Sequence, residues 1–149
     1  RADAPVNVVK AQPEDLLRYP FLILGTPTYG EGVLPGLDIG SQTESWAEFL
    51  PRLEGMDFSG QTVAFYGLGE QERYPDNFLD GIGILYDFFL AAGARCVGEW
   101  PAEGYTFVQS VALVDDHLIG LGLDLVTQDN LTESRIDAWL ASLAPHLPK

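Results

Sequence analysis

The stretch FLILGTPTYGEG, residues 21–32, decides the fold class. Its first four residues are all apolar, which is typical of a strand in a parallel sheet that is covered on both faces. Glycine, proline and threonine then end the strand and begin a loop. The stretch TVAFYGLGEQ at residues 62–71 repeats this order, and VNVV at residues 6–9 is a shorter strand candidate. The sequence therefore predicts an α/β protein with a parallel sheet.

Two helical patterns accompany these strands. The first can be capped by Thr43 and should be shortened or bent by Pro51, which cannot donate a backbone N–H. Its apolar face is predicted to consist of Trp46, Phe49, Leu50 and Leu53. The second pattern covers residues 76–92 and ends at Gly93. Its buried stripe is predicted to consist of Phe78, Ile82, Leu85 and Phe89.

The last third of the chain is mixed. Residues 95–98 are predicted to form a strand, and residues 111–114 and 118–121 a hairpin that turns at Asp115 and Asp116. A last helix is expected to begin at Thr132. Its inward-facing residues are predicted to be Ile136, Leu140 and Leu143.

Length and charge exclude several classes of protein. The 149 residues fit a single domain over residues 1–149, and 8 Lys and Arg against 22 Asp and Glu give a net charge of −14. Such a chain repels nucleic acid and anionic membranes and favours basic protein partners. It contains no apolar run near the roughly 18 residues that span a membrane, and no signal-peptide pattern opens it. We therefore expect a cytoplasmic protein.

The side chains do not suggest protein-borne catalysis. Cys96 is the only cysteine and lies in an apolar stretch, so an inert buried thiol is expected. His117 and His146 are too sparse for a metal site and belong to no recognisable triad. The pair Asp115 and Asp116 is more typical of a turn than of a glycosidase. We expect that the protein is not an enzyme and that any redox activity comes from a cofactor.

The two glycine-containing loops are the best candidates for a binding site. Ligands of parallel sheets bind beyond the carboxyl ends of the strands, where both loops lie. Tyr29 in the first loop and Tyr74 in the second could stack on the two faces of a flat ligand. Two ordinary turns with half-buried tyrosines explain the pattern equally well. Neither loop matches GxxxxGK[ST] or GxGxxG, so nothing indicates ATP or a dinucleotide.

Four motifs resemble the long-chain flavodoxins, in order and over essentially the whole chain: FLILGTPTYGEGxLPG, ESWAEFLPRLEGMDFSGQTVAFYGLGEQ, YPDNFLD and GLGLD…Q…LTESRIDAWL. The spacer GVLPG at residues 32–36 most resembles the flavodoxins that serve nitrogen fixation. Residues 100–120 resemble the insertion that splits the last strand of the long-chain class. The resemblance implies a doubly wound parallel sheet with helices on both faces, and FMN as the cofactor.

The resemblance also implies a set of FMN-binding residues. Tyr29 would cover the inner face of the flavin and Tyr74 the outer face, with the second loop around the pyrimidine edge. Gly30 would supply the carbonyl that turns toward flavin N5 on one-electron reduction. Glu70 would disfavour extra negative charge on the flavin. The full set is Thr26, Pro27, Thr28, Tyr29, Gly30, Gly67, Leu68, Gly69, Glu70, Tyr74 and Asn77.

Three departures from the family pattern qualify these roles. Arg73 stands where the family often has glycine, which places a cation near the flavin edge. Leu125, Val126 and Thr127 replace an acidic, amide-bearing stretch before Gln128, which weakens any ribityl contact there. The sequence also begins after the first strand, the phosphate-binding loop and the helix of the family, about 30 residues. We expect that the sequence is N-terminally incomplete and that FMN binding is feeble without this first βα unit.

These observations lead to two hypotheses about function. The first is a low-potential one-electron carrier, a monomer that docks transiently on basic redox proteins. The resemblance implies reductases as donors and nitrogenase reductase or a similar protein as acceptor. The alternative is a cofactor-free flavodoxin-like scaffold that binds proteins through its acidic face. A flavin oxidoreductase with its own substrate is less well supported, because no residue near the two loops offers acid–base chemistry.

Overall fold

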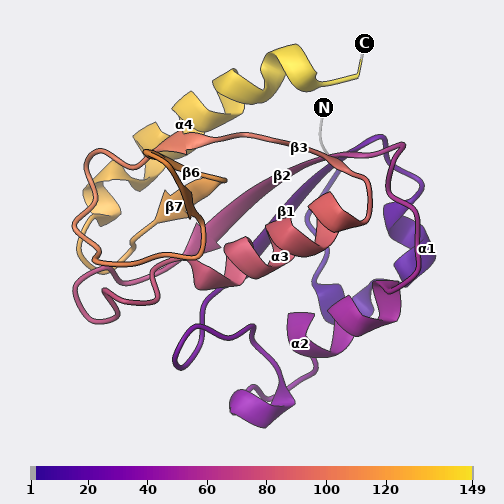
Figure 1. The fold of residues 1–149 in the computed structure, drawn as a ribbon, viewed down its shortest axis with the longest axis horizontal. Helices are drawn as coiled ribbons and strands as arrows, with labels where there is room; N and C mark the ends of the chain where they lie inside the picture. The colour runs from indigo at the N-terminus through magenta and orange to yellow at the C-terminus, as the bar shows by residue number, and fades with distance from the viewer. Residues whose placement is uncertain (1–2, 149) are drawn as a thin grey trace.

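A computed structural model describes residues 3–148, which form a parallel sheet with helices packed against it (Figure 1). The strand β2 (Thr62–Leu68) lies in the centre of this sheet and pairs with β1 (Phe21–Pro27) along one side. Two short strands, β3 (Arg95–Val97) and β7 (Leu121–Leu123), pair with the other side of β2. All three pairings are parallel. The predicted α/β class with a parallel sheet is therefore confirmed.

Helices cover both faces of the sheet, because alternate residues of β2 belong to two separate cores. Val63 and Phe65 lie in a core shared with α2 (Trp46–Phe49) and α3 (Asp80–Ala91). Ala64, which points the other way, lies in a core shared with α4 (Thr132–Leu143). Figure 1 shows α4 and α3 on opposite sides of the strands. The doubly wound arrangement thus follows from the period-two alternation of a strand.

Helix α3 has the predicted buried stripe but begins later than predicted. The four residues of the expected stripe, Phe78, Ile82, Leu85 and Phe89, are almost completely buried, although Phe78 lies two residues before the helix. The helix starts at Asp80 rather than near residue 76, because Leu79 adopts a left-handed conformation with φ of 61°. A buried leucine in this region is strained. Gly93, with φ of 96°, ends the helix as predicted.

The far edge of the sheet is a strand in two pieces. β3 pairs with residues 62–64 of β2 and β7 with residues 66–68, so both lie along the same edge. Residues 98–120 leave the sheet between them. They contain a small antiparallel sheet of β4 (Trp100–Pro101), β5 (Leu113–Val114) and β6 (His117–Leu118). The predicted turn is confirmed, with Asp115 at φ of 55°, but the hairpin strands are only Leu113–Val114 and His117–Leu118, and Leu121 belongs to β7 of the parallel sheet.

The strand predicted at residues 6–9 is wrong. Val8–Lys10 is a turn of 3₁₀ helix and no strand of the sheet. The side chain of Asn7 accepts a hydrogen bond of 3.1 Å from the backbone N–H of Val9. Such a local bond gives the backbone an alternative to sheet pairing.

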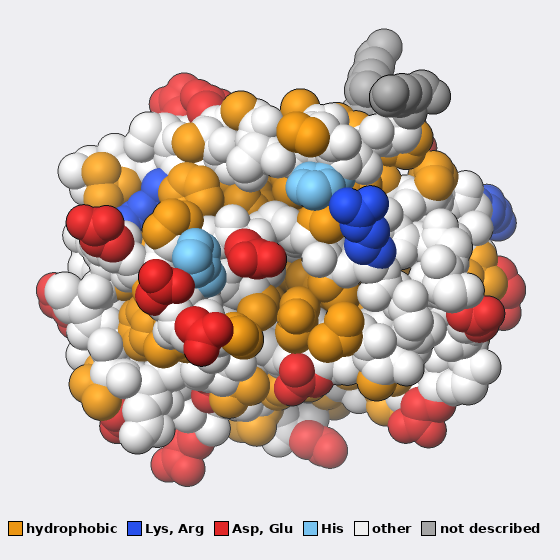
Figure 2. All heavy atoms as spheres, turned by 45° about the horizontal axis from the view of Figure 1, so that its top comes forward, with side chains coloured by type: hydrophobic (Ala, Val, Ile, Leu, Met, Phe, Trp, Pro, Cys, Tyr) orange, Lys and Arg blue, Asp and Glu red, His pale blue; other side chains and the backbone are white. Residues whose placement is uncertain are grey.

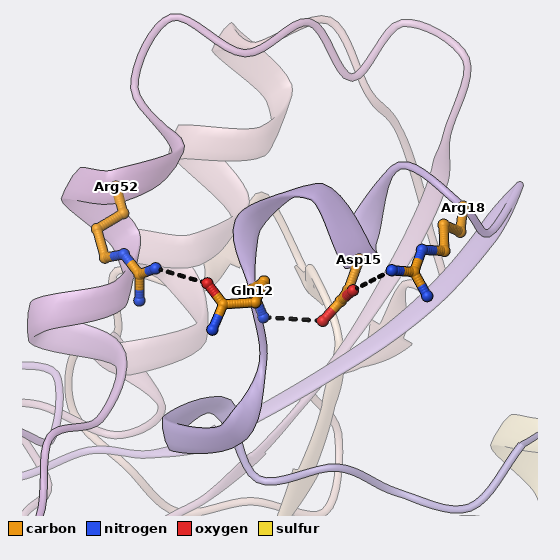
Figure 3. A network of polar contacts seen from close by, with 4 residues as sticks. All are labelled: Gln12, Asp15, Arg18 and Arg52. Carbon is orange, nitrogen blue, oxygen red and sulfur yellow. Dashed lines mark hydrogen bonds and ion pairs between the residues drawn. The ribbon is translucent and has the colours of Figure 1, made fainter.

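A polar network fastens the next short helix, α1 (Pro13–Leu16), as Figure 3 shows. Asp15 accepts a 2.8 Å hydrogen bond from the backbone N–H of Gln12 and pairs with Arg18 at 2.9 Å. Arg52 donates a 3.1 Å hydrogen bond to the side chain of Gln12. The N-terminal segment is thereby attached to the 3₁₀ turn Leu50–Leu53.

Helix α2, in the connection from β1 to β2, begins at a different residue from the one predicted. Ser45 rather than Thr43 precedes α2, and the carboxylate of Glu48 accepts a 3.3 Å hydrogen bond from the N–H of Ser45. The α-helix ends at Phe49 and continues as the 3₁₀ turn. Pro51 therefore shortens the helix as predicted.

Two residues expected to be buried are exposed. Leu140 of α4 faces solvent, because Trp139 occupies the inner position and donates a 2.8 Å hydrogen bond to the carbonyl of Gly98. Ile23 of β1 is also exposed. Helix α4 packs on β7 at the opposite edge of the sheet. The apolar sequence of β1 predicted a strand covered on both faces. In the described residues one face of β1 is left open at Ile23.

Candidate functional site

The two candidate loops leave the sheet side by side. Pro27, the last residue of β1, is in register with Leu68, the last residue of β2. Tyr29 and Tyr74 follow these strands and are 40% and 44% exposed. Both rings are therefore accessible at the carboxyl edge of a parallel sheet, where ligands of such sheets bind.

The first loop contains a closed turn. Tyr29 and Val33 exchange two backbone hydrogen bonds of 2.9 Å each. Gly30 and Gly32 lie between them with φ of 53° and 92°, a region that favours glycine. The turn thus constrains the backbone on both sides of Gly30.

The two threonines of the first loop have structural partners. Thr26 is buried and donates a 2.8 Å hydrogen bond to the carbonyl of Pro27. Thr28 accepts a 2.8 Å hydrogen bond from the backbone N–H of Gly81, in the first turn of α3. Thr28 therefore holds the loop against the helix and supplies a partner for an N–H that the helix leaves unpaired.

The glycines of the second loop are explained by packing. A Cβ atom at Gly67 would lie 3.0 Å from Ile82, and one at Gly69 would lie 2.9 Å from Phe78. These contacts come from the start of α3, which approaches the loop closely. The sequence pattern suggests that these glycines let a ligand approach, whereas the structure gives them a role in admitting the helix.

A buried polar cluster that the sequence pattern did not reveal begins at Gln71, the residue after Glu70. The side chain and backbone N–H groups of Gln71 donate to Asp124 at 3.0 and 3.1 Å, and Thr127 donates to the same carboxylate from its N–H and hydroxyl. Burial acts to raise the pKa of Asp124, but these hydrogen bonds outweigh burial and hold the pKa below its usual 3.8. The cluster fixes the start of the second loop to the end of β7.

Residues 106–109, in the segment between β3 and β7, run along the second loop. The N–H groups of Val108 and Gln109 both donate to the carbonyl of Pro75, at 2.7 and 2.9 Å. The ring of Phe107 stacks on Phe78 with centroids 5.1 Å apart. Beyond these contacts, Thr106 donates to the side chain of Gln71. The segment therefore supports the loop that carries Tyr74.

Positive charge is scarce around the loops. Arg73 is the one Lys or Arg within residues 25–33 and 67–79, and its guanidinium carbon lies 5.3 Å from the ring centroid of Tyr74. This distance is typical of a cation–π contact. Figure 2 shows acidic side chains spread over one face of the molecule, with few Lys or Arg side chains among them. The Arg73 guanidinium therefore lies against the ring of Tyr74.

Gln128 has its side chain occupied. Its Nε2 donates to the carbonyl of Gly104 at 2.9 Å, and its Oε1 accepts from Arg135 at 2.8 Å. The preceding Leu125 and Val126 are exposed apolar residues. The side-chain amide of Gln128 is therefore bonded within the protein.

A hollow of about 390 Å³ lies on one side of the first loop. Pro27 and Tyr29 line it together with hydroxyl-bearing residues such as Ser41, Thr43 and Ser45. The second loop contributes no residue to this hollow. Tyr74 therefore does not line this hollow.

The other reactive groups give no sign of chemistry. Burial raises the pKa of the half-buried Cys96 thiol to about 11, and His117 is an exposed partner of Asp116 at 2.6 Å. Within residues 3–148 no three His, Cys, Asp or Glu side chains form a possible metal site. No helix in that range is long and apolar enough to cross a membrane.

The fold is that of a doubly wound α/β protein whose paired loops leave the carboxyl edge of its sheet. The sequence model of the flavodoxin family matches residues 2–139. The chain is 51% identical to a flavodoxin of Enterobacter agglomerans over 145 residues, which are 97% of this chain and 82% of that protein. It is 38% identical to flavodoxin 1 of Escherichia coli over 144 residues, or 95% of this chain and 76% of that protein.

A solved structure agrees with these relatives. The flavodoxin of Fusobacterium nucleatum bound to flavin mononucleotide superimposes with a TM-score of 0.85 at 31% identity, over 96% of this chain and 80% of that one. The chain belongs to the flavodoxin family. Flavodoxins are electron-transfer proteins rather than enzymes, and they carry electrons on FMN.

Proposed function

We propose that the chain is a low-potential one-electron carrier that binds FMN non-covalently between the Tyr29 and Tyr74 loops. The observation that carries this proposal is the pair of exposed tyrosines at the ends of adjacent parallel strands. The F. nucleatum flavodoxin at 31% identity, bound to FMN, supports the choice of ligand. Bound FMN would supply the redox chemistry, which the side chains of the chain do not offer.

The residues present fit a flavin. Two exposed aromatic rings suit the flat faces of a flavin. The loops that carry these rings contain glycines, whose backbone can approach the edge of the flavin. The residues proposed to bind FMN are Thr26, Pro27, Thr28, Tyr29, Gly30, Gly67, Leu68, Gly69, Glu70, Tyr74 and Asn77. Thr26 would act through its backbone, because its side chain is buried and bonded to Pro27.

Charge supports both the low potential and the kind of partner. A net charge of −14 opposes the addition of an electron to the flavin, and Glu70 acts in the same direction. The same charge favours transient docking of a monomer on basic reductases and on an acceptor such as nitrogenase reductase. The edge strand in two pieces supports the long-chain type, and the spacer at residues 32–36 supports the nitrogen-fixation type. A cytoplasmic location is part of the proposal.

The test is a titration with FMN followed by quenching of flavin fluorescence. We would compare the 149-residue chain with the protein extended at its N-terminus to the start of its gene, called the extended protein below. Tight binding by the extended protein, and a one-electron reduction of the bound flavin, would support the carrier. Binding by neither form would reject it and leave the cofactor-free scaffold.

A further inference from the structure

Asp80 is a buried acid that the proposed function does not use. It is the first residue of α3 and is 5% exposed. Its Oδ1 accepts a 2.8 Å hydrogen bond from the backbone N–H of Val111, in the inserted segment. Its Oδ2 accepts a 3.1 Å hydrogen bond from the side-chain amide of Asn77, in the second loop. Burial of a carboxylate is costly unless such partners are present, so both bonds matter.

The first loop rests on the same pair of side chains. A Cβ atom at Gly32 would lie 2.6 Å from Oδ2 of Asp80 and 2.9 Å from Nδ2 of Asn77. Gly32 belongs to the closed turn between Tyr29 and Val33. The carboxylate of Asp80 therefore touches all three segments around the candidate site: the first loop, the second loop and the insertion.

The contact pairs an acid with an amide. Asp80 offers two acceptor atoms, one for Val111 and one for Asn77, whereas an uncharged amide offers only one. An asparagine at position 80 would keep the acceptor for Val111 and turn an NH₂ group toward Asn77. The Asn77 amide would then have to turn over and present its Oδ1 to that NH₂ group.

We propose that Asp80 is a positioning residue for the flavin: its carboxylate fixes the Gly30 turn relative to the Tyr74 loop. The inference rests on the proposed placement of FMN between these loops. It assigns no contact between Asp80 and the flavin itself. The carboxylate acts through Asn77 and through the backbone at Gly32, and so determines where the carbonyl of Gly30 and the ring of Tyr74 lie.

The test exchanges the two side chains. Asp80→Asn should force the Asn77 amide to turn over, and Asn77→Asp should place two carboxylates together. The double exchange Asp80→Asn with Asn77→Asp restores one donor and one acceptor and keeps the net charge. In the extended protein we would measure FMN affinity by titration, both one-electron midpoint potentials, and the stability of the apoprotein in urea.

Asn77→Asp should weaken FMN binding by about tenfold or more, because two carboxylates, one of them buried, then face each other, and should change the gap between the two potentials. Asp80→Asn should act in the same direction but more weakly. The double exchange should bind FMN more tightly than Asn77→Asp alone, and it should stay below the wild-type affinity because the Asn77 amide itself belongs to the proposed FMN site. Wild-type affinity and potentials in Asn77→Asp, or a double variant no better than Asn77→Asp, would overturn the inference. An extended wild-type protein that binds no FMN would reject the proposed function as well.

A second variant approaches the contact from the other loop, should the exchanges fail to fold. Gly32→Ala adds a methyl group against Asp80 and Asn77 at a φ of 92°. Gly55→Ala is the matched control, because Gly55 has a φ of 81° and a Cβ atom there would meet nothing within 4 Å, so that only the backbone strain is shared. The inference requires a larger loss of FMN affinity and a larger change in potential for Gly32→Ala. Equal effects of the two variants would contradict it.

Discussion

The hydroxyl of Thr28 accepts a 2.8 Å hydrogen bond from the backbone N–H of Gly81. This bond joins the first loop to the first turn of α3 across 53 positions of sequence. Thr28→Val keeps the shape of the side chain and removes the acceptor, so it should lower the free energy of unfolding by about 1 kcal/mol. Urea unfolding measures the change, with Thr43→Val, an exposed threonine, as control. Equal stabilities of the two variants would mean that the bond contributes nothing.

Tyr74→Ala tests the proposed outer face of the flavin site. Loss of one stacked ring should weaken FMN binding by about 1–3 kcal/mol, if base–aromatic stacking is a guide. Fluorescence titration of the extended protein measures this change. Tyr19→Ala is the control, since Tyr19 is similarly exposed but lies before β1. Unchanged affinity in Tyr74→Ala would count against the two-ring arrangement.

Arg73→Ala tests the cation above Tyr74. Its removal takes a positive charge away from the site, so the more reduced flavin is stabilised less and the lower midpoint potential should fall. For an exposed charge the effect should be about 10–40 mV. Arg52→Ala is a matched control, because the Arg52 guanidinium lies 5.6 Å from the ring centroid of Phe49, away from both loops. A rise in potential, or an equal fall in both variants, would contradict the assignment.

Asp124→Asn should remove a pH-dependent part of the stability. Because the folded-state pKa of Asp124 is held below 3.8, its ionised form stabilises the fold above that pH, and the contribution disappears as the pH falls through the folded-state pKa. At pH 7 the variant should be about 2 kcal/mol less stable than the wild type. The difference in urea midpoints should shrink below about pH 4. A difference that stays constant across this range would exclude ionisation of Asp124 as the cause.

Cys96 should react slowly with thiol reagents. Burial raises its pKa from 9.0 to about 11, so the thiolate fraction at pH 8 is about a hundredfold lower than for an unshifted thiol. Labelling with a disulfide reagent should be correspondingly slow in the folded protein and fast in urea, and its rate should rise as the pH approaches 11. Rapid labelling of the folded protein at pH 8 would show that the thiol is accessible and ionised.

Local patterns predicted most of the fold correctly. The 4,3,4 spacing from Phe78 to Phe89 predicted a buried helical face, and all four residues are buried. Pro51 predicted the end of α2, because a missing N–H acts within one turn. The apolar run at residues 21–24 and the second strand pattern at residues 62–66 predicted the parallel sheet. Each of these signals depends on residues close together in sequence.

The sequence predictions fail where the structure depends on an unusual backbone conformation or on a contact between residues far apart in the chain. The left-handed Leu79 delays α3, and no side-chain pattern announces such a strained leucine. Trp139 displaces Leu140 from the inner position because its indole N–H finds the carbonyl of Gly98, 41 positions away in sequence. The bond between Gln71 and Asp124 spans 53 positions. A single sequence gives no sign of which polar residues meet in this way.

Because the edge strand is in two pieces, β3 and β7, the length of the segment between them does not affect how they pair with β2. Only Phe65 of β2 lies between the residues that pair with β3 and those that pair with β7. Gly98 and Gly120 stand at the two exits. A Cβ atom at Gly98 would crowd Leu143 and Trp139 of α4, and one at Gly120 would crowd Phe65 of β2. The chain therefore leaves the sheet and returns to it almost at the same point. A change in the number of residues between these glycines would leave the four strands of the parallel sheet in register, so this edge tolerates a difference in chain length.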